Sequence, residues 1–358
     1  MGIPVEPGQP GRHANPAGTR GLAFVEFSTA EPGELARLFT EIGFVRSTRP
    51  DNRNITYWHQ GGVRFVLNCE PDTHGGQFFA EHGPCISALG FHVEDAQQAF
   101  DRALAFGATS YAGQHRKVFD ERAIVGIGGT LLYLVDDTSP AVRLRAEGSA
   151  SDAGPTGVGI TAVDHLTHNV RAGSLEDWAD FYTRIFGFRE VFYLSAEGAA
   201  TGFRTRALKS PCDGICIPIN EPTDPKSQIQ EYIDLFKGEG VQHLAFATRD
   251  LPITIEQLSS RIPFMSIPAT YYEQIDARLP GHGEHVERLK RNGILLDGTR
   301  NARGGWDLLL QIFSKNVIGP TFFEFIQRKG NEGFGEGNAR ALFEAIERDQ
   351  MERGVVRT

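Results

Sequence analysis

The sequence predicts an α+β fold of tandem βαβββ modules that form two open, barrel-like domains. Two internal repeats indicate it: residues 86–108 align without a gap with residues 241–263, and residues 24–44 resemble residues 167–188. Each segment of the first pair contains a short apolar strand followed by an amphipathic helix. The second pair each end a helix in Gly-Phe, and glycine commonly stops a helix. Four such units, two in each domain, imply curved sheets with helices outside and a pocket inside.

The division into domains follows from length and from two stretches rich in small residues and proline. The chain has 358 residues, with 40% hydrophobic and 23% charged residues, which is typical of a globular protein with two domains. Stretches rich in Gly, Pro or Ser read as a tail and a linker. We therefore expect a disordered tail at 1–20, a non-catalytic domain at 21–148, a linker at 149–160 and a catalytic domain at 161–358.

Composition also excludes some partners. The formal net charge of −9 argues against a nucleic-acid partner, which would require a basic face. No run approaches the roughly 18 apolar residues that a membrane helix needs, and the N-terminus lacks the apolar core of a signal peptide. The 4 cysteines form no CxxC pair and are expected as free thiols in a reducing compartment. These observations predict a cytoplasmic protein.

The stretch "VDHLTHNV" (163–170) places His165 and His168 three residues apart in a strand-like segment. Side chains alternate between the two faces of a strand, so these two histidines should point to opposite faces. At most one of them is therefore expected in a given pocket.

Three potential metal ligands of the second half have no counterpart in the first. His243 aligns with Ala88, the strand that contains His165 corresponds to residues 21–29, which lack a histidine, and Glu324 falls close to Leu144. If these residues were structural features of the repeat, both halves should contain them. We therefore predict a metal site in the second half alone.

Two imidazoles and one carboxylate leave about half of an octahedral coordination sphere open, as in the facial triad of non-heme Fe(II) oxygenases. Each residue alone has a simpler interpretation. His165 and His243 could be hydrogen-bonded core histidines, and Glu324 in "TFFEFIQ" could face solvent. A glutamate flanked by apolar residues is costly to bury unless it is paired or ligated. The pattern by itself leaves these alternatives open.

Several longer motifs surround these residues, in a fixed order: "IPINEP" (217–222), "KSQIQEY" (226–232), "GEGVQHLAF" (238–246), "TYYEQI" (270–275), "LLLQIF" (308–313), "FFEFIQRKG" (322–330) and "GFGEGN" (333–338). With "VDHLTHNV" they resemble the 4-hydroxyphenylpyruvate dioxygenases, members of the vicinal-oxygen-chelate superfamily. The resemblance runs from about residue 21 nearly to the end of the chain. It implies the vicinal-oxygen-chelate type of fold.

The resemblance also implies roles for individual residues. His165, His243 and Glu324 would bind one Fe(II) per chain. The substrate would be an aromatic 2-oxo acid, which reacts with O₂ in an oxidative decarboxylation with migration of the side chain on the ring, giving homogentisate. A helix at about 336–350 would close the pocket, and the assembly would be a homodimer or homotetramer. Polar pocket residues would be Asn220, Gln228, Gln242 and Gln311, and apolar walls Pro218, Phe313, Phe322 and Phe334.

Two positions depart from the family pattern. Thr205 stands where the family usually has serine, and it keeps the hydroxyl. Ala339 stands where the family usually has phenylalanine, so the pocket loses a phenyl group there. The related 4-hydroxymandelate synthases, which oxidise the benzylic carbon of the same substrate, also lack that phenylalanine. They tend to lose the asparagine that Asn220 matches, however, so homogentisate formation is favoured.

Two further alternatives come from other classes. A non-catalytic small-molecule-binding protein can have the same fold, but the three ligands would then be coincidental. A ring-cleaving extradiol dioxygenase uses the same type of triad. The "IPINEP", "KSQIQEY" and "GFGEGN" motifs do not belong to that group.

Overall fold

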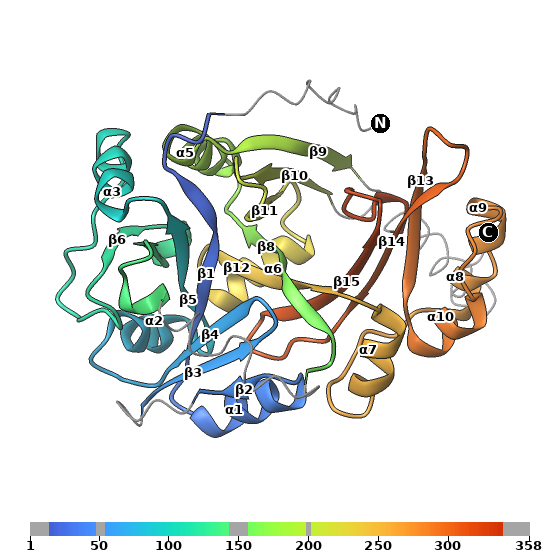
Figure 1. Cartoon of the computed structure of the whole chain (residues 1–358), viewed down its shortest axis with the longest axis horizontal. Coiled ribbons are helices and arrows are strands. Elements are labelled where there is room, and N and C mark those ends of the chain that lie inside the picture. Colours follow the sequence, from blue (N-terminus) through green and yellow to red (C-terminus); the bar gives the residue numbers. More distant parts are fainter. Residues whose placement is uncertain (1–13, 48–53, 143–156, 198–201, 339–358) are drawn as a thin grey trace. The chain divides into compact units, whose positions relative to one another are not determined.

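The computed structural model of the chain describes residues 14–47, 54–142, 157–197 and 202–338 (Figure 1). The first half contains two units that each begin with a strand and a helix. The first strand starts ahead of residue 21, because Thr19 already lies in β1 and its backbone N–H donates to the side chain of Asn15. The elements are β1 (Thr19–Ser28), α1 (Pro32–Glu41), β2 (Val45–Arg46), β3 (Ile55–Gln60), β4 (Val63–Asn68), α2 (His74–His82), β5 (Cys85–Val93), α3 (Ala96–Ala105), β6 (Arg122–Val125), a 3₁₀ turn (Ile127–Gly129) and β7 (Leu131–Val135).

The second half repeats this order and adds helices before its last strands. The start of β8 lies within the predicted linker, most of which falls outside the described residues. The elements are β8 (Ile160–Asn169), α5 (Leu175–Phe186), β9 (Arg189–Glu197), β10 (Gly202–Lys209), β11 (Cys216–Pro222), α6 (Gln228–Phe236), β12 (Gly240–Thr248), α7 (Leu251–Leu258), α8 (Ala269–Tyr272), α9 (Ile275–Arg278), α10 (Val286–Asn292), β13 (Leu295–Arg300), β14 (Trp306–Phe313) and β15 (Phe322–Lys329).

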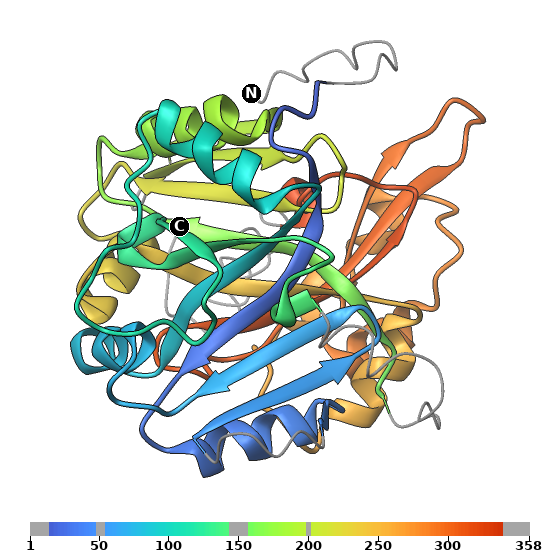
Figure 2. The same ribbon diagram turned by 60° about the vertical axis from the view of Figure 1, so that its left-hand side comes forward.

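The strands form two mixed sheets, and their order confirms the predicted fold class and the internal duplication. The first sheet has the order β2-β3-β4-β1-β5-β7-β6, and the second, read from its other edge, β9-β10-β11-β8-β12-β15-β14-β13. In each sheet the first and fourth strands of a unit pair in parallel, with Ser28 opposite Asn68 and Asn169 opposite Asn220. The strands can be followed from two directions in Figures 1 and 2.

One detail of the predicted repeat is wrong. The alignment placed Glu324 close to Leu144, but β15 occupies the place in its sheet that β7 occupies in the other. Glu324 therefore corresponds to residues of β7, which ends before Leu144. Short apolar strands resemble one another, and only the hydrogen-bonded order of the sheet identifies the partner. The first half still lacks a counterpart of Glu324, because "LLYLV" in β7 contains no carboxylate or histidine.

The outer face of the first sheet is covered by α1. Phe39 of this helix is fully buried, and its ring lies 5.2 Å from that of Phe27 on β1 and 5.0 Å from that of Phe65 on β4. In both views α1 lies against the β2–β3–β4 side of the sheet (Figures 1 and 2). Such aromatic pairs bury large apolar area and fix the helix on the sheet.

The inner face of the first sheet is filled by side chains. Phe24 packs against Phe119 and Tyr133, with ring centroids 5.0 and 5.5 Å away. Ala88, which aligns with His243, belongs to the same buried cluster. Aromatic rings therefore occupy the face that carries the candidate ligands in the second sheet, and this half has no comparable set of donors among its described residues.

In the second half, α5 packs through Tyr182, Ile185 and Phe186. It ends at Gly187 with φ +73°, a left-handed conformation that glycine adopts at no steric cost. The Gly-Phe helix stop read from the sequence is thereby confirmed. Within the described ranges, no helix is long and apolar enough to cross a bilayer.

Candidate functional site

The site begins on β8, where alternation sends successive side chains to opposite faces. His165 is buried with 3% exposure and turns towards β12, where its Nε2 lies 3.3 Å from Nε2 of His243. His168 turns to the other face, as expected, and its Nε2 lies 3.0 Å from the hydroxyl of Tyr182 on α5. Burial lowers the pKa of His168 to about 3, so it is a neutral core histidine.

The Nδ1 atoms of the two facing histidines each have an oxygen partner on the preceding residue. Nδ1 of His165 lies 2.8 Å from Oδ1 of Asp164, and Nδ1 of His243 lies 3.0 Å from Oε1 of Gln242. A carboxylate oxygen and an amide oxygen only accept, so each Nδ1 carries the proton and donates. Each Nε2 is then left with its lone pair directed into the site, which is the tautomer that binds a metal.

The third candidate ligand comes from β15. Glu324 is 2% exposed, and its Oε1 accepts a hydrogen bond of 3.0 Å from Nε2 of Gln311 on β14. The solvent-facing alternative for Glu324 is therefore wrong. A carboxylate buried this deeply needs compensation from a partner or a cation.

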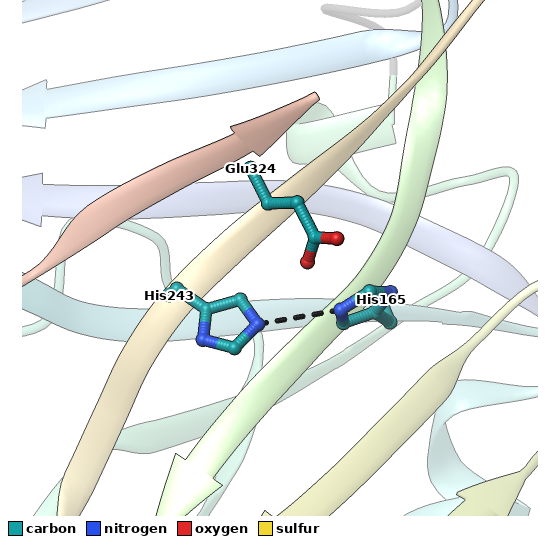
Figure 3. A group of neighbouring side chains, drawn as sticks. All are labelled: His165, His243 and Glu324. Carbon is teal, nitrogen blue, oxygen red and sulfur yellow. Dashed lines mark hydrogen bonds between the residues drawn. The ribbon is translucent and has the colours of Figure 1, made fainter. Parts of the chain in front are cut away.

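The three side chains converge from β8, β12 and β15, which are neighbours in the eight-stranded sheet. One potential ligand atom from each of His165, His243 and Glu324 lies within 4.8 Å of the others. Figure 3 shows the two imidazoles facing each other and the carboxylate directed towards them. Two facing lone pairs beside a buried carboxylate repel one another unless a cation lies between them, so the donor set fits a divalent transition metal.

A second polar group lies on the same face of the sheet, further along β8. The hydroxyl of Thr205 on β10 donates to Oδ1 of Asn220 on β11 over 2.7 Å, and Nδ2 of Asn220 donates to Oδ1 of Asn169 over 3.3 Å. Asn169 is two alternations beyond His165, so both point to one face. Nδ2 of Asn169 is buried and has no hydrogen-bond partner among the described residues. Such an orphan donor can be satisfied by a water or by an oxygen of a ligand.

The predicted apolar walls lie on the strands that carry these groups. The ring of Phe322 stacks on His243 with centroids 4.7 Å apart. Phe313 pairs with Glu324 across β14 and β15, and Pro218 lies two residues before Asn220 on β11, so both share a face with the polar groups. Phe334 lies after β15, with the guanidinium of Arg328 at 5.8 Å from its ring.

One of the predicted pocket residues is not brought to the group. Gln228 is exposed at the first turn of α6. Ala339 lies outside the described residues, as does most of the helix expected at 336–350; Glu336–Asn338 are helical. The prediction for these residues stays a prediction.

Sequence reasoning missed three residues that shape the site. Asp164 stands behind His165, and the hydroxyl of Thr167 lies 2.9 Å from Nε2 of His243. Asn169 holds the orphan donor. All three stand in the "VDHLTHNV" stretch, and the alternation that excluded His168 could have selected Thr167 and Asn169 as neighbours of His165.

Comparisons with known proteins agree with this geometry. The family model described as "Hydroxyphenylpyruvate dioxygenase, HPPD, N-terminal" matches residues 13–144, and that of the "Glyoxalase/Bleomycin resistance protein/Dioxygenase superfamily" matches residues 162–274. A 4-hydroxyphenylpyruvate dioxygenase of Legionella pneumophila (strain Corby) is 43% identical over 348 residues, 96% of this chain and 98% of that protein. Hemolysin VllY of Vibrio vulnificus (strain CMCP6) is 44% identical over 352 residues, 96% of this chain and 98% of that protein. Among solved structures, a triple mutant of 4-hydroxymandelate synthase from Streptomyces coelicolor has a TM-score of 0.73, with 27% identity over 93% of this chain and 99% of that chain.

The fold and the site define a dioxygenase of the glyoxalase, or vicinal-oxygen-chelate, superfamily. The chain belongs, within that class, to the 4-hydroxyphenylpyruvate dioxygenase family, and it is an enzyme of that dioxygenase type. This family implies a small-molecule substrate and O₂.

Proposed function

We propose that the chain converts 4-hydroxyphenylpyruvate and O₂ to homogentisate and CO₂, with one Fe(II) held by His165, His243 and Glu324. The observation that carries the proposal is the convergence of two imidazoles and one carboxylate on adjacent strands, with ligand atoms within 4.8 Å. Two imidazoles and a carboxylate are the donor set of non-heme iron oxygenases. The relatives that are 43% identical over nearly the whole chain support the substrate.

Bound at this site, Fe(II) would supply a chelation point for the 2-oxo acid and the activation of O₂. The chain's own residues orient the substrate. Thr205, Asn169 and Asn220 offer hydrogen bonds to its polar groups, and Phe313, Phe322 and Pro218 form apolar walls for its ring. Gln242 and Gln311 hold ligands in place, and we assign Gln228 and Phe334 to the pocket on the family resemblance. An apolar, closed site excludes water from a reactive step.

A second candidate is benzylic hydroxylation of the same substrate to 4-hydroxymandelate. The absence of phenylalanine at Ala339 and the similarity to a solved 4-hydroxymandelate synthase favour it. Asn220 and its hydrogen bonds to Thr205 and Asn169 favour homogentisate instead. A third candidate, a binding protein without a metal, gives no reason for two imidazoles and a carboxylate to converge within 4.8 Å.

The test is product identification. Purified protein is loaded with Fe(II) without air, mixed with 4-hydroxyphenylpyruvate in air, and followed by O₂ uptake, chromatography and mass. We expect homogentisate with one O₂ consumed for each CO₂ released. 4-Hydroxymandelate would establish the second candidate, and no uptake with iron bound would indicate another substrate. A protein that neither binds iron nor consumes O₂ would support the third.

A variant at Ala339, where the sequence differs from the family pattern, makes this test more specific. Ala339→Phe should leave homogentisate as the product, with O₂ uptake coupled to product at least as tightly as in the parent protein. A change of product in this variant would contradict the proposal that Ala339 is a tolerated difference.

The remaining expectations stay predictions. We propose that residues 21–148 form the non-catalytic domain, which the family match to residues 13–144 supports, and that residues 161–358 form the catalytic one. A homodimer or homotetramer and a cytoplasmic location are inferred from the family alone. Light scattering after size-exclusion chromatography would measure the oligomeric state.

A further inference from the structure

We propose that Tyr271 and Arg278 are positioning residues for the metal ligand Glu324, although neither touches it. They act through a chain of hydrogen bonds that sets which amide group faces the carboxylate. The inference rests on the proposed metal site. In order, the chain joins Arg278, Tyr271, Asn338, Gln311 and Glu324.

The hydroxyl of Tyr271 is the point at which the direction of the chain is set. It lies 3.0 Å from Nη2 of Arg278 and 2.9 Å from the backbone N–H of Leu296, and both of these groups donate. A hydroxyl has one proton and two lone pairs, so its proton is left for an acceptor. Two acceptors lie within reach, Oδ1 of Asn338 at 2.6 Å and the carbonyl oxygen of Leu296 at 3.2 Å. The shorter contact to Asn338 takes the proton, because the Leu296 oxygen already accepts from Arg278 over 3.0 Å.

The direction then passes through two side-chain amides. Because Oδ1 of Asn338 accepts from Tyr271, its Nδ2 faces Gln311 and donates to Oε1 over 2.8 Å. Because Oε1 of Gln311 is used in this way, its Nε2 donates to Glu324 over 3.0 Å. Either amide could be turned by 180° in isolation. The hydrogen-bond chain excludes the turned forms, because the guanidinium at one end only donates and the carboxylate at the other end only accepts.

Burial makes this order costly to break. Tyr271, Asn338 and Gln311 are 0, 2 and 3% exposed, so water cannot easily replace a lost partner. A turned Gln311 would place its carbonyl oxygen against the carboxylate of Glu324, and two facing acceptors in a dry environment are strongly unfavourable. The chain of hydrogen bonds therefore holds one carboxylate oxygen of Glu324 against the amide of Gln311 and keeps Glu324 in a single orientation.

Backbone packing holds the middle of the chain in place. Gly335 has φ +81°, and a Cβ there would overlap Oε1 of Gln311. The N–H of Gly337 donates to Oδ2 of Asp297 over 2.8 Å. Arg278 also packs over the ring of Tyr271, 5.2 Å from its centroid. Asn338 is thus fixed by the fold, and the hydroxyl of Tyr271 decides how its amide is turned.

The neighbouring tyrosine supplies a matched control. Tyr272 is 4% exposed, and its hydroxyl has no hydrogen-bond partner among the described residues. Tyr271→Phe and Tyr272→Phe therefore remove the same atom from adjacent buried sites, and only the first interrupts the chain. The readout is the dissociation constant for Fe(II) alone, measured without air by competition with a chelator.

We expect Tyr271→Phe to weaken Fe(II) binding by about tenfold or more, the range seen when outer-shell partners of metal ligands are removed. Tyr272→Phe should stay within about twofold of the parent protein. Equal affinities for the two variants would overturn the inference while leaving the proposed function intact. Absence of Fe(II) binding in the parent protein would overturn both.

A second variant keeps the test decisive if Tyr271→Phe fails to fold, which circular dichroism would show. Asn338→Asp is nearly isosteric but replaces the donor that faces Gln311 by an acceptor. Gln311 should then turn its amide to donate to the new carboxylate and present its oxygen to Glu324. Fe(II) affinity should fall by about tenfold or more, again as for outer-shell partners. An unchanged affinity in a folded N338D protein would contradict the proposed direction of the chain.

Discussion

The Nε2 atoms of His165 and His243 face each other at 3.3 Å, although the two residues are far apart in the sequence. The Nδ1–H group of each imidazole donates a hydrogen bond to an oxygen, of Asp164 for His165 and of Gln242 for His243. Two lone pairs are thus pointed at one place. A bound cation would relieve their repulsion. Removal of the cation should therefore lower the stability of the fold as well as the activity.

Metal should stabilise the fold through these atoms. A ligand that binds only the native state at 100 times its dissociation constant adds about 2.7 kcal/mol to the free energy of unfolding. Fe(II), or Co(II) as a substitute, should therefore raise the melting temperature of the protein and not that of His243→Ala. His115→Ala, a change of an exposed histidine, should respond like the parent protein. Stabilisation of His243→Ala to the same extent would place the metal elsewhere.

The carboxylate behind His165 should tune metal affinity. Asp164→Asn keeps an acceptor for Nδ1 but removes the negative charge that makes the imidazole a stronger ligand. We expect about tenfold weaker metal binding by equilibrium dialysis. Asp180→Asn on the exposed face of α5 changes the same charge far from the ligands and serves as the control. Equal metal affinities for the two variants would show that the charge of Asp164 does not contribute to metal binding.

The hydroxyl at position 205 should act on substrate binding. Thr205→Ser keeps the donor to Asn220 and restores the residue usual in the family, so KM should change little. Thr205→Val keeps the shape but leaves Oδ1 of Asn220 without its 2.7 Å partner. Asn220 is partly buried, and an acceptor that loses its donor there costs on the order of 1 kcal/mol or more, so we expect KM to rise by about tenfold. KM is measured from steady-state O₂ uptake at a series of substrate concentrations. Equal KM values for Thr205→Ser and Thr205→Val would show that the hydroxyl does not act on substrate binding.

A buried acid in the first half should make stability depend on pH. Glu26 is 2% exposed and accepts from Asn68 and Ser87, while its Oε2 has no partner among the described residues. Burial raises the pKa of this carboxyl to about 7, which the two hydrogen bonds partly oppose. The folded chain therefore keeps a proton that the unfolded chain releases near pH 4.5. Stability is lost as pH rises from there through about 7.

Glu26→Gln imitates the protonated acid and should abolish this loss. Relative to the parent protein, its free energy of unfolding in urea should increase by on the order of 1–3 kcal/mol between pH 5 and pH 8. Glu34→Gln, at an exposed position of α1, controls for net charge. Parallel pH profiles for the parent protein and Glu26→Gln would mean that the carboxyl titrates normally.

Local patterns predicted the parts of the site that local rules govern. Alternation along β8 separated His165 from His168. The structure confirms this, because His168 lies on the opposite face, where it contacts the hydroxyl of Tyr182 on α5. The Gly-Phe stop after α5 is likewise confirmed by the left-handed Gly187. The same rule applied to Thr167 and Asn169 would have found both neighbours of the ligands.

The same local patterns failed where the partner of a strand had to be chosen. "LLLQIF" and "FFEFIQ" are as apolar as "TLLYLV", so the alignment assigned Glu324 the wrong counterpart. The hydrogen bonds that place β15 beside β12 depend on strands distant in the chain. No window of sequence contains that information.

By itself the sequence determined the family, the internal duplication and the residue types of the triad. The motifs identify the family, and the comparison of the two halves shows that only the second contains these two histidines and this glutamate. Only the tertiary structure decided how these residues work. The proton positions of His165 and His243, the amide direction of Gln311 and the reach from Arg278 to Glu324 depend on atoms brought together by sheet order and burial. Hydrogen-bond direction is a property of close neighbours in space, and for most of these residues the neighbours are remote in the chain.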